Sequence, residues 1–271
     1  MNTCSTRPKI GLALGAGGAR GFCHIGVIEV LQENDIPIDI ITGCSMGALL
    51  GGGLAAGVTC EQMRQAAEKV NSVNLIDFSL TTKDKGGIIP GMRVMKIVNQ
   101  LVGKDKKIED CQIPFAAIAT DIYSGTLHTF TSGTLWDAIR ASIAIPGIFQ
   151  PVTLGNKLLT DGGVLRRMPI QEARDLGADI VIAVDPIGPP YPLKSKSTVA
   201  ILEKSAELIA WQAFKHEGKA ADVLITPILG TKSQLLFRKN LNAIQAGRTA
   251  ATAMLPEIRK AVYNNSQGEN K

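Results

Sequence analysis

The sequence predicts one α/β domain, a three-layer α/β/α sandwich around a mostly parallel central sheet. Strand-like and helix-like segments alternate along the chain, which is typical of a parallel sheet with helices on both faces. Residues 115–120 and 180–184 are near-continuous apolar runs, as expected for central parallel strands. With 271 residues, 45% of them hydrophobic, the chain can bury a substantial core.

We expect this domain to cover residues 8–263, with flexible tails at 1–7 and 264–271. The sequence motifs lie within residues 10–185, and residues 186–263 form a C-terminal α/β extension. This extension begins with a surface loop rich in proline and lysine. Its predicted elements are a helix over 199–218, a strand over 223–228 and a helix over 241–263.

The first predicted strand, residues 9–14, leads into the glycine-rich loop 15–21 and then into a helix over 22–32. A loop of this kind exposes backbone N–H groups at a helix N-terminus, where they favour an anion. The anion is either a bound phosphate or the oxyanion of an acyl-transfer reaction. A nucleotide site stays open on this loop alone because Asp39 is available for a ribose, although Arg20 replaces the third glycine of G-x-G-x-x-G.

Residues Gly43-Cys44-Ser45-Met46-Gly47 match G-x-S-x-G between a predicted strand over 38–42 and a predicted helix over 48–57. A serine on such a turn is lifted out of the sheet, and small neighbours let a substrate approach its hydroxyl. The dipole of the following helix favours negative charge on the serine oxygen. Ser45 is therefore the candidate nucleophile, whereas we expect Cys44 to be a small buried residue.

A serine nucleophile needs a base, and the chain has three histidines. We expect His24 to be packed or to cap the first helix, and His128 to be a surface residue of a strand. His216 alone follows the Ser…Asp…His order of α/β-hydrolases, but its charged neighbours indicate exposure to solvent. Asp161 lies at the end of a predicted strand over 157–160, and the two glycines that follow it are typical of an ordinary turn.

The glycine loop, the serine turn, Asp161-Gly162-Gly163 and the A-S-x-x-I-P-G stretch within residues 140–147 together resemble the patatin-like phospholipase family. The resemblance is to its compact bacterial members and covers about the first 185 residues. It implies a Ser–Asp dyad without histidine, with Ser45 as nucleophile and Asp161 as proton acceptor. It further implies an oxyanion hole at Gly17, Gly18, Ala19 and Arg20, and supporting roles for Gly15, Gly21, Gly43, Gly47, Gly162 and Gly163.

Such a dyad favours esters or thioesters over amides because an ester needs less acid assistance at its leaving group. An aspartate with an ordinary pKa of about 3.9 is a poor base, and partial burial beside the serine would raise its pKa. We therefore expect hydrolysis of phospholipid or lysophospholipid esters without a cofactor. An acyl transferase or acyl thioesterase on a similar site, or a regulatory or scaffold protein without activity, remains an alternative.

The charge of the chain favours lipid over nucleic acid as a partner. The net charge is +5, and the lysine clusters at 104–107 and 194–196 are not interleaved with aromatic residues. A basic surface suits transient contact with anionic headgroups at a bilayer. Arg166 and Arg167 closely follow Asp161, so one of them is a candidate headgroup contact, with exposure to solvent as the alternative.

Several further expectations concern motifs that are absent. Five cysteines without a C-x-x-C pair argue against a metal site or a disulfide framework. The N-terminal residues show no signal peptide and no apolar span is suited to cross a membrane, so we expect a cytoplasmic protein, with peripheral contact at the inner membrane face. Residues 78–93 are irregular and apolar at their centre, which fits either a mobile flap over a lipid site or an ordinary connector.

Overall fold

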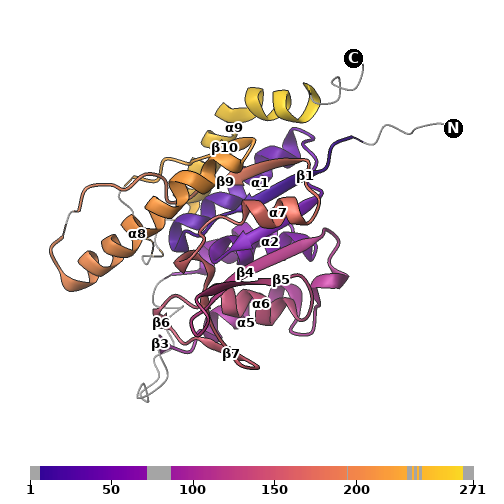
Figure 1. The fold of residues 1–271 in the computed structure, drawn as a ribbon. Coiled ribbons are helices and arrows are strands. Elements are labelled where there is room, and N and C mark those ends of the chain that lie inside the picture. Colours follow the sequence, from indigo (N-terminus) through magenta and orange to yellow (C-terminus); the bar gives the residue numbers. More distant parts are fainter. Residues whose placement is uncertain are drawn as a thin grey trace.

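A computed structural model describes residues 7–71, 87–193, 195–230, 234, 237 and 240–264 (Figure 1). Within these ranges it leaves the side chains of Ile88, Val199, Glu203, His216 and Asn264 undescribed. The predicted α/β/α sandwich with a mostly parallel sheet is confirmed.

The main sheet has the strand order β10-β9-β1-β2-β4-β8-β7, and β5 pairs with the other edge of β4. The first five of these strands are parallel, whereas β5, β8 and β7 are antiparallel to their neighbours. A separate parallel pair joins β3 to β6. The strands are β1 (Ile10–Leu14), β2 (Ile40–Cys44), β3 (Gly87–Ile89), β4 (Phe115–Asp121), β5 (Thr126–Phe130), β6 (Gly147–Phe149), β7 (Val152–Leu154), β8 (Lys157–Asp161), β9 (Ile180–Val184) and β10 (Val223–Ile225).

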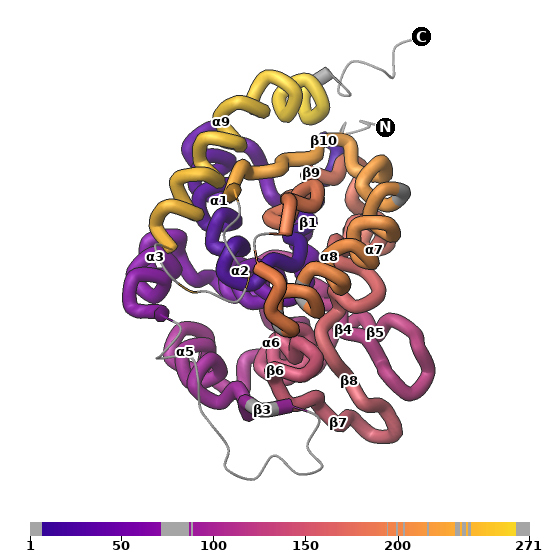
Figure 2. The backbone as a smooth tube through the Cα atoms, turned by 90° about the vertical axis from the view of Figure 1, so that its left-hand side faces the viewer, coloured from indigo at the N-terminus to yellow at the C-terminus, as the bar shows by residue number. Residues whose placement is uncertain are grey.

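Helices cover both faces of the sheet (Figure 2). One face carries α1, α2, α3, α5, α6 and α9, and the other carries α7 and α8. The helices are α1 (Cys23–Glu33), α2 (Met46–Ala55), α3 (Cys60–Lys69), α5 (Met92–Val102), α6 (Leu135–Ser142), α7 (Ile170–Asp175), α8 (Thr198–Glu217) and α9 (Asn240–Asn264), with short 3₁₀ turns η1 (Gly18–Phe22), η2 (Ile108–Asp110), η3 (Gly162–Val164) and η4 (Gly218–Ala220).

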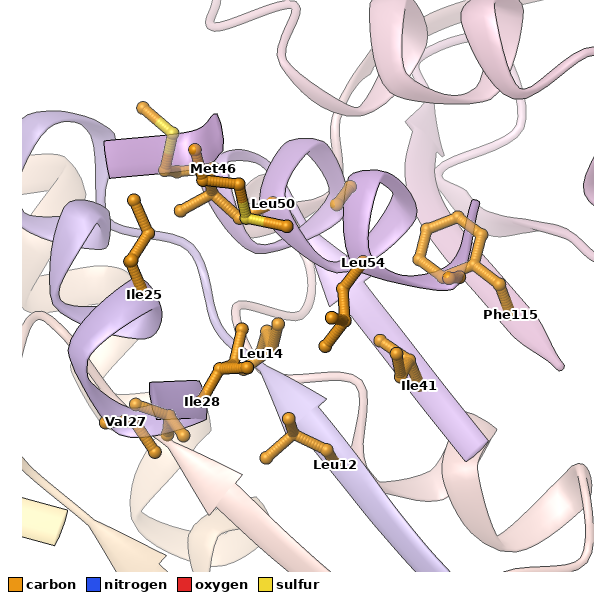
Figure 3. Close-up of a cluster of buried hydrophobic side chains, with 14 of the residues drawn as sticks. Leu12, Leu14, Ile25, Val27, Ile28, Ile41, Met46, Leu50, Leu54 and Phe115 are labelled. Carbon is orange, nitrogen blue, oxygen red and sulfur yellow. The ribbon is translucent and has the colours of Figure 1, made fainter. Parts of the chain in front are cut away.

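The alternation of side chains along β1 divides the core into two parts. Leu12 and Leu14 point into the larger cluster, where Met46, Leu50 and Leu54 of α2 meet them (Figure 3). Ala13 points to the opposite face, into the smaller cluster beneath α7 and α8. Since successive residues of a strand face opposite sides, a wholly apolar β1 is what burial on both faces requires.

The fold bears on two expectations from the sequence, the flap or connector over 78–93 and the ribose contact of Asp39. The interval 78–93 is only partly described: residues 78–86 lie outside the described ranges, and the rest forms β3 and the first turn of α5. Asp39 precedes β2 and binds the guanidinium of Arg7, with oxygen–nitrogen distances of 2.6 and 2.7 Å. It therefore lies at the amino end of the strands, opposite the glycine loop, which removes the basis for a ribose contact.

Candidate active site

The candidate site lies where two strands meet head-on beside β4. Strand β2 runs along β4 until Cys44 pairs with Ile118. Strand β8 comes from the opposite direction along the same edge and ends with Asp161 opposite Ala119. The residue that follows β2 and the last residue of β8 are therefore brought together, although 116 positions separate Ser45 from Asp161 in the chain.

Ser45 occupies a strained turn between β2 and α2. Its φ of 55° and ψ of −121° fall in a region that side-chain-bearing residues rarely adopt. Glycines make the turn sterically feasible, because a Cβ atom on Gly47 would lie 2.0 Å from the Leu14 carbonyl oxygen, and one on Gly43 would lie 2.5 Å from the Ala48 Cα atom. Tight backbone or side-chain neighbours likewise surround the other predicted motif glycines, Gly15, Gly17, Gly18, Gly21, Gly162 and Gly163.

The A-S-x-x-I-P-G stretch supports this turn, a role that the sequence alone did not predict. The Ser45 backbone N–H donates to Ser142 Oγ at 2.9 Å, and the Ser142 hydroxyl donates to the Ile118 carbonyl at 2.7 Å. The Ala144 carbonyl accepts the backbone N–H of Asp161 at 2.9 Å. The short segment 142–144, at the end of α6, therefore contacts the backbone at both candidate catalytic residues.

Asp161 is buried, and its carboxyl group interacts with the Ser45 hydroxyl, which acts to lower its pKa. Its Oδ1 also accepts the backbone N–H of Gly163 at 2.8 Å and faces the thiol of Cys44 at 3.8 Å. Burial raises the pKa of Asp161 to about 6, while these hydrogen bonds act in the opposite direction. Such a carboxylate is a better proton acceptor than an exposed one and is still ionised at neutral pH.

Cys44 is a buried neighbour of the site, as the sequence predicted. Burial, together with the nearby Asp161 carboxylate, raises the pKa of its thiol well above the ordinary value. The thiol therefore stays protonated and faces Asp161 Oδ1 and the Arg166 carbonyl as a donor. A protonated, buried thiol is a poor nucleophile.

The glycine loop offers fewer amides than the resemblance implied. The Ala19 N–H donates to the Gln234 carbonyl at 2.7 Å, and the Arg20 N–H donates to the Gly17 carbonyl at 2.9 Å. No such backbone acceptor is found for the Gly17 and Gly18 amides in the described part of the chain. Gly18 lines the same cavity as Ser45, so these two amides are the better placed candidates for an oxyanion hole.

The described histidine side chains have partners away from Ser45. His24 Nε2 lies 2.8 Å from the Gly15 carbonyl, and burial lowers the pKa of its imidazole to about 4. His24 is therefore neutral and donates to the start of the glycine loop, in line with the predicted packed role. His128 Nδ1 lies 2.9 Å from Lys157 Nζ. The side chain of His216 lies outside the described residues.

The two arginines after Asp161 bind carboxylates instead of facing the site. Arg167 is buried and ion-paired with Asp185 at 2.7 Å, and its guanidinium carbon lies 3.9 Å from the centre of the Phe214 ring. The headgroup contact suggested for Arg167 is therefore wrong, and so is its alternative, solvent exposure. Arg166 is partly buried and pairs with Glu172 at 2.7 Å and Glu217 at 3.2 Å. Carboxylates of this chain bind both guanidinium groups, so we propose neither arginine as a headgroup contact.

Ser45 opens into an apolar cavity between α2, α3, α5 and α6. The space, including its opening to solvent, is about 920 Å³. Among the described residues that line it, Ser45 carries the single hydroxyl, and the other side chains are aliphatic, aromatic or thioether groups. The lining includes Phe22, Met46, Leu49, Leu50, Val94, Val98, Leu101, Ile143 and Phe149. Such a lining accommodates a hydrocarbon chain and offers it no polar partner.

Within the described ranges, no three imidazole, thiol or carboxylate groups are close enough to bind a metal ion together. The polar groups that the described residues place here are the Ser45 hydroxyl, the Asp161 carboxylate and nearby backbone amides. A hydroxyl beside a buried carboxylate at the wall of an apolar cavity is suited to acyl transfer from an ester with a hydrocarbon chain.

The fold and the site define a class of protein, an α/β/α sandwich that carries a serine on a strained strand–helix turn beside a buried aspartate. The model of the patatin-like phospholipase family matches residues 12–174. The chain therefore belongs to the patatin-like phospholipase family, and the resemblance found in the sequence is confirmed.

Individual relatives agree with this assignment. An NTE family protein of Mycobacterium bovis, described as uncharacterized, is 41% identical over 182 residues, 66% of this chain and 49% of the relative. Lysophospholipase NTE1 of Debaryomyces hansenii is 34% identical over 181 residues, 65% of this chain and 12% of that protein. The crystal structure of VipD from Legionella pneumophila shares the fold, with a TM-score of 0.56 and 14% identity over 94% of this chain and 67% of VipD. The chain thus spans about half the length of its mycobacterial relative.

Proposed function

We propose that the protein is a serine acyl hydrolase that cleaves carboxylic esters of phospholipids or lysophospholipids. The observation that carries the proposal is the position of the Ser45 hydroxyl beside the buried carboxyl group of Asp161, at the wall of an apolar cavity. Membership of the patatin-like phospholipase family supports a lipid substrate. A lysophospholipid has one acyl chain, which suits a single cavity, and one relative is named a lysophospholipase.

In the proposed reaction, the acyl chain lies in the cavity and the ester carbonyl lies next to Ser45. Asp161 accepts the hydroxyl proton as the Ser45 oxygen attacks the carbonyl carbon. The negative charge that develops on the carbonyl oxygen is stabilised by the Gly17 and Gly18 amides and by the dipole at the start of α2. Asp161 then gives the proton to the leaving alkoxide, and water hydrolyses the acyl-serine by the same route.

A panel of lipid esters tests this proposal on the wild type and on Ser45→Ala, Asp161→Asn and His216→Ala. We expect the first two variants to lose at least about 1,000-fold in turnover, because each removes a group that acts in the transition state. We expect His216→Ala to keep most of its activity. Equal losses in all three variants, or activity that survives Ser45→Ala, would contradict the dyad.

Two further assays separate this function from its alternatives. A fluorophosphonate probe labels an activated serine, so a scaffold protein without activity would leave Ser45 unlabelled. Product analysis with an added alcohol or thiol acceptor separates hydrolysis from transfer. A thioester substrate that is turned over much faster than the matched oxygen ester would favour the thioesterase alternative.

A further inference from the structure

Helix α8 presents an uncharged, largely apolar face to solvent. Leu202 and Ile209, two turns apart, are 65% and 70% exposed, and Ile201 and Leu208 are also exposed. Among the other described side chains on this face are the small or uncharged groups of Ser205, Ala206, Gln212 and Ala213. Exposed aliphatic groups gathered on one helix face mark a surface that binds a partner or a lipid phase.

The opposite face of α8 is fixed to the segment that carries Asp161. Phe214 and Trp211 pack against the guanidinium of Arg167, and Glu217 binds Arg166. Both arginines lie within six residues of Asp161, and α8 also contacts η3, which follows Asp161 directly. The exposed face of α8 is therefore held at a fixed position relative to the candidate catalytic residues.

Two further exposed aliphatic residues, Val164 and Leu165, follow the Asp161-Gly162-Gly163 motif. Val164 is the last residue of η3, which α8 contacts. In Figure 1, α8 projects away from the sheet at the side of the molecule where β1 ends. Ser45 follows β2, which is parallel to β1, so α8 projects from the same edge of the sheet on which the candidate nucleophile lies.

Charge indicates the kind of partner. Lys196, Lys215 and Lys219 are exposed before, on and after α8, whereas Glu207 and Glu217 are partly buried in ion pairs. A helix with an apolar face bordered by lysines is suited to the interface of an anionic bilayer, where aliphatic groups enter the acyl region and ammonium groups bind phosphate. None of the described helices has the length and apolarity needed to cross a membrane.

We propose that the exposed face of α8, extended by Val164 and Leu165, binds the surface of an anionic lipid bilayer and holds the catalytic edge of the sheet against it. The proposal rests on the proposed function, because a lipid hydrolase obtains its substrate from such a surface. Docking through α8 places Ser45 next to the lipid phase, so that a lipid ester can enter the apolar cavity without crossing much water.

Sedimentation with vesicles tests this surface on the full chain. The vesicles contain phosphatidylcholine alone or with phosphatidylglycerol, and the test variant is Leu202→Gln/Ile209→Gln. The matched control, Ser205→Gln/Ala213→Gln, adds the same side chain to the same helix face but keeps both large aliphatic groups. We expect the wild type and the control to bind the anionic vesicles, with less binding at high salt, and the test variant to bind at least about tenfold more weakly.

A soluble substrate separates this inference from the proposed function. Hydrolysis of p-nitrophenyl butanoate should be equal in the three proteins, because α8 does not touch the acyl cavity. A second variant, Ile201→Gln/Leu208→Gln, should also weaken vesicle binding. If the wild type fails to hydrolyse any ester but binds vesicles through Leu202 and Ile209, the proposed function fails and the surface stands.

Three outcomes would overturn the α8 surface. In the first, the wild type does not bind anionic vesicles. In the second, the test variant binds them as strongly as the control does. In the third, the wild type is a dimer that the Leu202→Gln/Ile209→Gln substitutions dissociate while vesicle binding is unchanged, which would assign this face to a second copy of the chain.

Discussion

At the scale of single residues, the carboxyl group of Asp161 combines burial with several donors. It accepts a hydrogen bond from the Gly163 amide, interacts with the Ser45 hydroxyl, and faces the Cys44 thiol. These donors favour the ionised form, but desolvation is the larger effect and raises the pKa to about 6. The same burial that makes Asp161 a stronger base therefore makes its charge unfavourable for the folded state.

The pH dependence of turnover should report this carboxyl group. Asp161 must be ionised to accept the serine proton, so kcat/KM for an uncharged ester should rise about tenfold per pH unit below pH 6 and reach a plateau above it. The measurement is a rate profile with p-nitrophenyl butanoate between pH 4.5 and 8. A midpoint near pH 7 that disappears in His216→Ala would instead identify a histidine base.

Replacing the base should stabilise the fold at alkaline pH. The folded pKa of Asp161, about 6, lies above its ordinary value of 3.8, so the native state binds the proton more tightly than the unfolded chain does. The stability gained from this proton is fully present below pH 3.8 and is lost as the pH rises through about 6. The asparagine side chain of the Asp161→Asn variant carries no charge. At pH 8 this variant should therefore be more stable than the wild type by up to about 3 kcal/mol.

Urea unfolding of both proteins at pH 8, 6 and 4.5 measures this difference, which should shrink toward acid pH. His24 titrates in the opposite sense, because its lowered pKa removes stability as the pH falls from 6.5 toward about 4. Both proteins contain His24, so its effect cancels in the comparison. An Asp161→Asn variant that is less stable at every pH would mean that the hydrogen bonds of the carboxylate outweigh its desolvation.

At the scale of elements, residues 142–144 at the end of α6 support both residues of the candidate dyad. Ser142 connects the Ser45 amide to the Ile118 carbonyl of β4, and the Ala144 carbonyl binds the Asp161 amide. The strained conformation of Ser45 has to be maintained by such surroundings. This segment therefore acts as a positioning element that does not itself touch the hydroxyl or the carboxylate.

Removing the Ser142 hydroxyl should reduce turnover more than it reduces binding. Ser142→Ala leaves the buried amide of Ser45 and the carbonyl of Ile118 without this partner, which should cost about 1–3 kcal/mol of stability. A loosened serine turn should lower kcat roughly tenfold or more on a soluble ester, with a smaller change in KM.

Thr42→Val is the matched control for this substitution. Thr42 is also a buried hydroxyl, and it donates to the Pro169 carbonyl at 2.7 Å, away from Ser45. The Thr42→Val substitution should lower the free energy of unfolding by a similar amount but leave kcat nearly unchanged. A similar loss of kcat in both variants would mean that Ser142 acts through general stability and has no specific positioning role.

Local sequence patterns predict much of this element structure. Apolar, β-branched runs predict strands over 115–120 and 180–184, close to β4 (Phe115–Asp121) and identical to β9 (Ile180–Val184). The predicted helix over 22–32 is α1 (Cys23–Glu33). Helix α3 (Cys60–Lys69) begins where the Thr59 side chain accepts the Gln62 amide, a capping pattern between residues close in sequence. These features are determined by neighbouring residues, so one sequence is sufficient to find them.

Features that depend on distant pairing were not predictable in the same way. The head-on meeting of β2 and β8 requires the register of both strands on β4, which no local pattern contains. The contact between Ser142 and Ser45 spans 97 positions. Arg167 follows a motif near the site, yet Asp185 and Phe214, both distant in sequence, keep it buried. The resemblance to a family located Ser45 and Asp161, whereas their surroundings required the fold.

At the scale of the whole molecule, the two faces of the sheet have different roles. The larger helical layer encloses the apolar cavity, and the thinner layer of α7 and α8 binds the segment after Asp161. Ser45 and Asp161 lie between these layers, at the edge of the sheet where β2 and β8 end. Substrate selection and surface binding can therefore be altered separately by substitutions on opposite faces.

The cavity follows α2 away from the nucleophile. Ser45, Met46, Leu49, Leu50 and Gly53 all line it, and eight residues of α-helix correspond to roughly 12 Å. A Cβ atom at Gly53 would have its nearest neighbour, the Met63 methyl group, at 3.6 Å, an ordinary contact. A larger side chain at this position would occupy the end of the cavity without touching Ser45.

A graded substitution of Gly53 should therefore select against long acyl chains. Gly53→Ala adds one methyl group and serves as the control for the loss of glycine, whereas Gly53→Leu fills the space. We expect Gly53→Leu to lower kcat/KM for a hexadecanoyl ester at least about tenfold, with butanoyl ester hydrolysis within about twofold of the wild type. Equal losses for both esters would indicate damage to the fold, which thermal unfolding would detect. Unchanged hexadecanoyl turnover would place the acyl chain outside this cavity.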